Sequence, residues 1–124
     1  MEQKQVLIID DDQRNIFALK AVLRSRSIAC LSAGTGAEAL QLLAAGHRVG
    51  VVLMDIMMPD MDGYETISAL RAMPWNSRLP IIAVTAKAMV GDREKCLEAG
   101  ADNYISKPID VDELLVQLQQ YLSV

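Results

Sequence analysis

Acidic residues directly follow two short apolar runs of this sequence. Asp10 and Asp11 come after residues 5–9, and Asp55 comes after residues 50–54. An apolar run that stops at a polar residue is typical of a buried strand in a parallel sheet. The carboxyl ends of parallel strands share one edge, which is where open α/β folds bind their ligands. We therefore expect the three carboxylates to meet at one site.

Two further apolar runs end in residues that suit the same site. Thr85 follows residues 80–84, and Lys107 lies two residues after the run 103–105. Three neighbouring carboxylates repel one another unless a cation neutralises them, and oxygen ligands of this kind suit Mg2+. A carboxylate beside Mg2+ is a competent nucleophile toward a phosphoryl group, whose charge the metal, a lysine ammonium and a hydroxyl can share. This set of residues therefore predicts phosphoryl chemistry.

Segments with an apolar face at helical spacing separate the apolar runs. Such a segment begins after Asp12, which is predicted to cap it, and another begins after Asp110. Strands and helices thus alternate five times, which favours an α/β fold with a parallel sheet covered by helices on both faces. The sequence by itself does not fix the strand order. The predicted strands are 5–9, 28–31, 50–54, 80–84 and 103–105, and the helices between and after them include 37–45, 64–73 and 89–99.

Length and charge restrict the class of protein. The chain has 124 residues, enough for one domain, and is 52% hydrophobic with a net charge of −4. A mildly acidic domain is a poor candidate for direct binding of nucleic acid or of anionic membranes. Cys30 and Cys96 are too far apart in sequence for a metal-type or redox-type pair and are expected to be packed thiols. His47, the single histidine, is expected in a solvated loop, so the chain offers no obvious histidine-based triad or zinc site.

Four segments together resemble the receiver domains of two-component response regulators. They are VLIIDDD, VVLMDIMMPDMDGYE, PIIAVTA and GADNYISKP, and the match runs from Val6 to Tyr121. The resemblance implies a doubly wound, flavodoxin-like (βα)5 fold with strand order 2-1-3-4-5, formed by a single domain over residues 1–124. RNIFAL, TAKAM and GDREKCLEAGAD are most similar to receivers attached to hybrid histidine kinases.

The resemblance also implies a role for each residue of the site. Asp55 corresponds to the phosphoacceptor, Asp10 and Asp11 to the acidic pair that holds Mg2+ together with Asp55, and the backbone carbonyl of Met57 to a further ligand. Thr85 corresponds to the switch hydroxyl.

Other residues of the last two strands and their loops have counterparts too. Lys107 matches the ammonium that pairs with the phosphoryl group, and its bond to Pro108 is expected to be cis. Tyr104 matches the aromatic that changes rotamer with the switch hydroxyl. Met57 and Lys87 occupy the positions that tune the lifetime of the phosphoryl group, and Ala86 is small, as access to that group requires.

The implied function is a phosphoacceptor rather than an enzyme with turnover. A histidine kinase or histidine phosphotransfer domain is the expected donor. A downstream protein is expected to bind the face formed by the fourth helix, fifth strand and fifth helix, around Met89, Tyr104 and Ile109. We expect a monomer or weak dimer in the bacterial cytoplasm. The chain ends just after its last helix, which suggests either a single-domain regulator or a domain cut from a larger protein, such as the cytoplasmic part of a membrane-attached kinase.

Two other readings stay open at the level of sequence. A phosphatase with an aspartyl nucleophile needs a second acid two residues later, where this chain has Met57. A phosphorylation-independent interaction module of the same fold would not need the complete set of site residues. Each residue taken alone has a simpler explanation. Asp55 could end a strand or cap a helix, Thr85 could be an ordinary hydroxyl at a strand end, and Lys107 could be an ordinary surface lysine. It is their joint occurrence that favours the phosphoacceptor.

Overall fold

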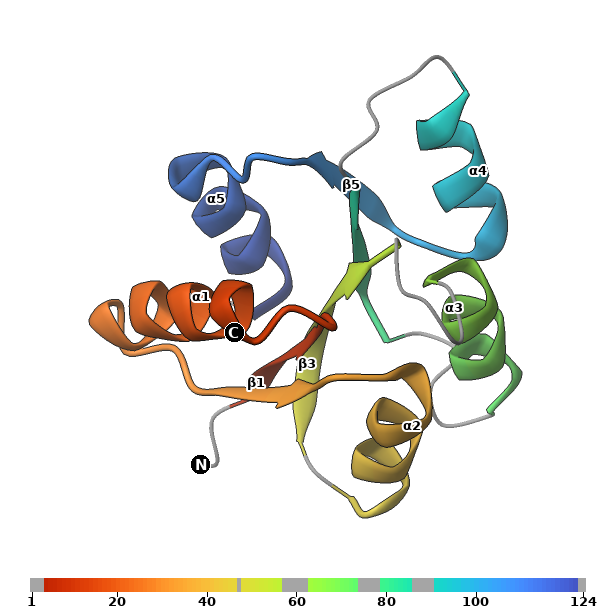
Figure 1. The fold of residues 1–124 in the computed structure, drawn as a ribbon, viewed down its shortest axis with the longest axis horizontal. Coiled ribbons are helices and arrows are strands. Elements are labelled where there is room, and N and C mark those ends of the chain that lie inside the picture. The colour runs from red at the N-terminus through yellow and green to blue at the C-terminus, as the bar shows by residue number, and fades with distance from the viewer. Residues whose placement is uncertain (1–3, 47, 57–62, 74–78, 86–90, 123–124) are drawn as a thin grey trace.

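The computed structural model describes residues 4–46, 48–56, 63–73, 79–85 and 91–122. Five strands alternate with five helices along these residues (Figure 1). Within the described residues, no helix is both long and apolar enough to cross a membrane. The elements are β1 Gln5–Ile9, α1 Gln13–Ser25, β2 Cys30–Ala33, α2 Gly36–Ala44, β3 Val49–Asp55, α3 Gly63–Ala72, β4 Ile81–Thr85, α4 Asp92–Ala99, β5 Asn103–Ser106 and α5 Val111–Leu122.

The five strands form one parallel sheet in the order β2-β1-β3-β4-β5. This confirms the predicted strand order. Because β1 and β3 are neighbours, Ile9 pairs with Met54 and the two strands end side by side. In the next pair, Asp55 lies opposite Val84. The sheet thus brings the carboxyl ends of β1, β3 and β4 together at one edge.

Alternate residues of the central strands enter two separate cores, one on each face of the sheet. Leu7, Val52 and Ile81 pack with α2, α3 and α4, whereas Val6 and Val51 pack with α1 and α5. Figure 1 shows the same division, with α1 and α5 on one side of the sheet and the other three helices on the opposite side. Burial on both faces explains why these strands are apolar throughout rather than alternating.

Polar side chains cap the two helices where the sequence predicted caps. The Asp12 side chain accepts a hydrogen bond from the Arg14 backbone N–H at the start of α1. Asp110 accepts one from the Glu113 backbone N–H at the start of α5, with an N–O distance of 3.2 Å. Each cap satisfies one of the N–H groups that a first helical turn leaves without a partner.

The second strand lies two residues later than the sequence analysis predicted. The structure places β2 at Cys30–Ala33 instead of 28–31. The reason is the end of α1, where Ser27 adopts a positive φ of 60° and the Ile28 backbone N–H still bonds to the Leu23 carbonyl. Ile28 therefore belongs to the turn that closes the helix, and pairing with β1 starts at Cys30.

The fourth helix also begins later than predicted. Its first residue is Asp92, because Gly91 has a φ of 99° and so lies outside helical geometry. Residues 86–90, which the predicted span partly included, lie outside the described residues.

Both cysteines are free thiols, as expected. Cys96 is buried and is part of the core under α4, and Cys30 is half-buried. Burial raises the pKa of the Cys30 thiol, against the opposing effect of the nearby Lys20 and Arg24 charges.

Arg71, at the end of α3, ties together the edge of the sheet opposite the acids. Its guanidinium donates to the carbonyls of Leu79 and Gly100 and to the Asp102 carboxylate, whose Oδ2 also accepts the Ile81 backbone N–H at 2.8 Å. One side chain thereby joins α3, the start of β4 and the turn after α4.

Replacing Arg71 with lysine is expected to lower the free energy of unfolding by about 1–3 kcal/mol, because one ammonium cannot reproduce the planar fork and leaves carbonyls without a donor. Urea unfolding followed by circular dichroism measures the change. Arg93→Lys, at an exposed position on α4, is the matched control and should unfold as the wild type does. Equal midpoints for Arg71→Lys and the wild type would contradict the importance of this contact.

Candidate phosphoryl and metal site

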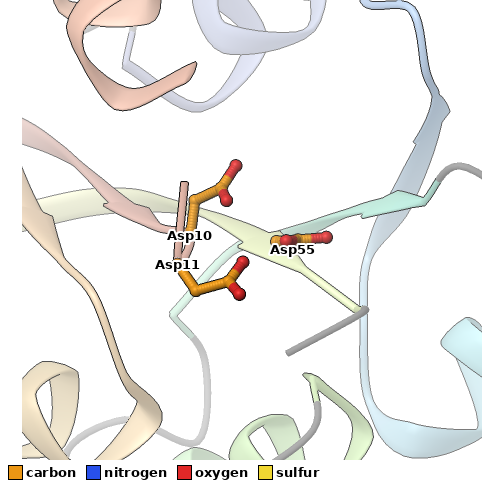
Figure 2. Close-up of side chains that lie close together, drawn as sticks. All are labelled: Asp10, Asp11 and Asp55. Carbon is orange, nitrogen blue, oxygen red and sulfur yellow. The ribbon is translucent and has the colours of Figure 1, made fainter. Parts of the chain in front are cut away.

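Three carboxylates gather at the carboxyl edge of the sheet. Asp10 and Asp11 follow β1, and Asp55 is the last residue of β3 (Figure 2). One oxygen from each lies within 4.8 Å of the other two. Asp10 and Asp55 are 3% and 4% exposed, whereas Asp11 faces solvent. The predicted convergence of these acids is therefore what the structure shows.

The buried Asp10 carboxylate is held by the start of α1. Its Oδ1 accepts the Asp12 backbone N–H at 2.9 Å. Its Oδ2 accepts a hydrogen bond from the side-chain amide of Asn15, in the first turn of the helix. Two donors from the chain therefore fix the direction in which this carboxylate points.

A lysine approaches the acids from the other side. The Lys107 ammonium lies 3.5 Å from Oδ1 of Asp55, and the Lys107 backbone N–H bonds to the Thr85 carbonyl at 2.8 Å. The Lys107–Pro108 peptide bond is cis, as the resemblance implied. The backbone after β5 is thereby tied to the end of β4, which places the ammonium beside Asp55.

The two residues predicted to act as a switch lie on adjacent strands. Thr85 is the last residue of β4, is 3% exposed and pairs with Ser106 in the sheet. Tyr104 is half-buried on β5, opposite Ala83, and packs against the core shared by α2, α3 and α4. Thr85 is therefore at the edge that carries the acids, and Tyr104 is set back from it.

The first residue of α3 is joined by a backbone contact to the residue that follows β3. The Gly63 N–H bonds to the Ile56 carbonyl at 3.0 Å, and the added Cβ of any other residue at position 63 would lie 2.8 Å from the Asp55 carbonyl oxygen. Met57, with the carbonyl predicted as a ligand, lies outside the described residues, as do His47, Ala86, Lys87 and Met89.

The donor set suits a small, hard divalent cation. It offers carboxylate oxygens from two neighbouring strand ends, and Mg2+ is typically held by one or two carboxylates with several waters. At the observed spacing, unit charges repel by a few kcal/mol at an effective dielectric constant of about 20, and a divalent cation would remove that repulsion. The residues present therefore fit Mg2+.

Among the described residues of the site, Asn15 is a side chain that sequence reasoning missed. Its signal is weak: asparagine is a poor helix former, and this one lies just inside a helix that Asp12 already caps. Its position five residues after Asp10 becomes informative only when the helix is seen to fold back over the strand end.

Comparison with known proteins identifies relatives over nearly the whole chain. The family described as the response regulator receiver domain matches residues 6–119. The polar-differentiation response regulator DivK of Brucella anthropi is 35% identical over 119 residues, which cover 96% of each protein. The sensor histidine kinase RcsC of Escherichia coli is 35% identical over 120 residues, or 97% of this chain but 12% of the kinase. The chain thus spans only a small part of that relative.

Solved structures give the same picture. The receiver domain of the sensor histidine kinase PA1611 from Pseudomonas aeruginosa, which has a magnesium ion coordinated in its active-site cleft, is 35% identical, with a TM-score of 0.87 and coverage of 99% of this chain and 100% of that one. The receiver domain of Ssk1 from Saccharomyces cerevisiae, crystallised with the histidine phosphotransfer protein Ypd1, is 25% identical, with a TM-score of 0.89 and coverage of 97% and 89%.

Proposed function

Because the chain belongs to the receiver domain family of response regulators, we propose that Asp55 is its phosphoacceptor. The observation that carries the proposal is the meeting of Asp10, Asp11, Asp55 and Lys107 at the carboxyl edge of the sheet. We further propose that residues 1–124 act as a single receiver domain. Its donor is a phosphohistidine on a histidine kinase or a histidine phosphotransfer domain, the class of partner seen with Ssk1.

In the transfer, an oxygen of the Asp55 carboxylate forms a bond to phosphorus while the phosphorus–nitrogen bond of the donor breaks. The electron pair of that bond stays on the donor imidazole nitrogen. This nitrogen takes up a proton from solvent, so the donor leaves as a neutral ring. The Lys107 ammonium, 3.5 Å from Asp55, pairs with an incoming phosphoryl oxygen. The Thr85 hydroxyl, at the end of the neighbouring strand, donates a hydrogen bond to a second phosphoryl oxygen.

Asp10, Asp11 and Asp55, with the carbonyl of Met57, are the proposed ligands of Mg2+. When bound, this cation supplies positive charge that offsets the carboxylates and the phosphoryl oxygens. The magnesium in the PA1611 receiver domain supports this assignment.

The output of the domain follows from charge added at one edge of the sheet. A phosphoryl group on Asp55 draws in Thr85 and Lys107, and this biases an equilibrium between two surface states. The proposed readout face comprises α4, β5 and α5, with Tyr104 changing rotamer together with Thr85. The similarity to RcsC and PA1611 supports a place within a hybrid histidine kinase.

Intact-mass spectrometry after incubation with acetyl phosphate and Mg2+ tests the proposal. We expect one phosphoryl adduct that disappears when a chelator replaces the Mg2+. If folded, Mg2+-binding protein shows no adduct with acetyl phosphate or with a phosphorylated histidine phosphotransfer domain, the phosphoacceptor assignment is wrong and a phosphorylation-independent interaction module becomes the better description.

Replacing Met57 with asparagine is expected to shorten the lifetime of the phosphoryl group. An apolar side chain two residues after the acceptor cannot orient an attacking water, whereas an amide can. Loss of the adduct from purified phosphoprotein, followed by intact mass over time, gives the decay rate. Met57→Leu, which keeps the position apolar, is the control and should decay like the wild type. Equal decay rates for all three proteins would refute the proposed role of this position in self-dephosphorylation.

A further inference from the structure

The hydrogen bond from Asn15 to Asp10 bears on which cation the site binds. Its side-chain amide donates to Oδ2 of Asp10, and the Asp12 backbone N–H donates to Oδ1. Each oxygen of this buried carboxylate therefore has one donor from the chain itself. We propose that Asn15 is a positioning residue that holds Asp10 rigid, so that the site prefers Mg2+ over a larger divalent cation such as Ca2+. This inference rests on the cation site of the proposed function.

The Asp10 carboxylate has few lone-pair directions left for a cation. A carboxylate has about four acceptor positions on its two oxygens, and two of them are taken by Asn15 and Asp12. With a donor on each oxygen, the carboxylate cannot turn about its last bond without breaking one of them. Only the remaining lone pairs, in fixed directions, are available to a cation.

Rigidity of this kind matters differently to the two cations. Mg2+ demands nearly ideal octahedral geometry at about 2.0–2.1 Å, whereas Ca2+ accepts irregular shells of six to eight oxygens at about 2.3–2.6 Å. A coordinating carboxylate that is held in one direction therefore favours Mg2+. A coordinating carboxylate that is free to turn weakens the binding of Ca2+ less than the binding of Mg2+. Contacts that orient a metal ligand typically change metal affinity by about 10–100-fold when they are removed.

The local sequence gives no competing reason for an asparagine at this position. The cap of α1 is already supplied by Asp12. Asparagine in a helix is less favourable than leucine, because its side chain competes for backbone hydrogen bonds. The contact with Asp10 accounts for a residue that the helix alone would not select.

The experiment compares cation binding by the wild type, Asn15→Leu and a control. Leucine has the same number and branching of side-chain heavy atoms but no donor. Gln13→Leu is the matched control, because it also replaces an amide with leucine in the first turn of α1, at an exposed position. Isothermal titration calorimetry measures the affinities for Mg2+ and Ca2+ separately, and circular dichroism confirms that each variant is folded. Asn15→Ala serves as a second variant if the leucine variant does not fold.

We expect Asn15→Leu to bind Mg2+ about tenfold or more weakly, with a clearly smaller loss for Ca2+. With acetyl phosphate, the Mg2+ concentration for half-maximal phosphorylation should rise. Gln13→Leu should change none of these quantities.

Two results would overturn the inference while leaving the proposed function intact: an unchanged Mg2+ affinity in Asn15→Leu, or equal losses for Mg2+ and Ca2+. A wild-type protein that binds no Mg2+ would instead refute the cation site itself, and the role of Asn15 with it.

Discussion

The Asp55→Asn variant is expected to carry no phosphoryl group under any donor condition that labels the wild type. An amide at position 55 lacks the anionic oxygen that attacks phosphorus, and the other two acids of the cluster belong to a different strand end. Intact mass after incubation with acetyl phosphate and Mg2+ should show complete loss of the adduct. Glu94→Gln, which removes an exposed carboxylate from α4, is the control and should be labelled like the wild type.

The same substitution is expected to stabilise the protein when no divalent cation is present. It removes one of three carboxylates, each of which has an oxygen within 4.8 Å of an oxygen of the other two. One opposing loss is the contact with Lys107, which is long at 3.5 Å and involves a lysine side chain that is 30% exposed, so it contributes little. The free energy of unfolding should therefore rise by about 1 kcal/mol, a modest gain of the kind often found when a charged functional site is neutralised.

Adding Mg2+ should reverse the order of stability. A ligand that binds only the native state stabilises it in proportion to its occupancy, and the wild type keeps the full set of acids. Urea unfolding of both proteins with and without Mg2+ measures all four values. A variant that is less stable than the wild type in chelator would show that the Lys107 contact outweighs the repulsion among the acids, contrary to this account of the site.

The strand ends could be predicted from sequence because each one combines two independent signals. Asp55 and Thr85 follow buried runs that only a parallel sheet accommodates, and parallel strands place their carboxyl ends at one edge. The convergence of the acids then follows from topology, without knowledge of any side-chain rotamer. The strand order itself came from the resemblance, because composition and spacing do not distinguish which strands are neighbours.

Contacts made by single side chains across the fold could not be predicted in this way. Arg71 reaches Gly100 and Asp102, which are 29 and 31 residues away in the sequence, through hydrogen bonds whose partners are mostly carbonyls. A carbonyl is present at every residue and so leaves no trace in the sequence. Asn15 is similar, because its partner is identified only once α1 is seen to start directly above the end of β1.

The error at the second strand has a local cause of the same kind. An apolar isoleucine at position 28 looks like the start of a strand, yet its backbone N–H closes the end of α1 by bonding to Leu23. The positive φ of Ser27 that permits this turn is not encoded by a glycine or asparagine at that position. Hydrophobic pattern therefore located the strand but not its first residue.

Replacing Gly63 with alanine is expected to lower the stability of the protein. A Cβ at this position would lie 2.6 Å from the Ile56 Cα and 2.8 Å from the Asp55 carbonyl oxygen, both of them backbone atoms that cannot turn aside. Overpacking of this kind typically costs about 1–3 kcal/mol, and a contact with rigid backbone belongs at the upper end, which exceeds the gain in helix propensity of about 1 kcal/mol. Thermal and urea unfolding measure the loss.

The clash also lies next to the acceptor, so it should affect the site as well as the fold. To accommodate the methyl group, the end of β3 and the start of α3 must separate, which moves Asp55 relative to the acids on β1 and weakens Mg2+ binding even at temperatures where the variant is folded. Gly34→Ala is the control, because its nearest neighbours would be 3.7 Å and 3.9 Å away, an ordinary contact distance, and it should leave both properties unchanged. If Gly63→Ala proved as stable and as tight for Mg2+ as that control, the close approach of α3 to the end of β3 would not be what sets the position of Asp55.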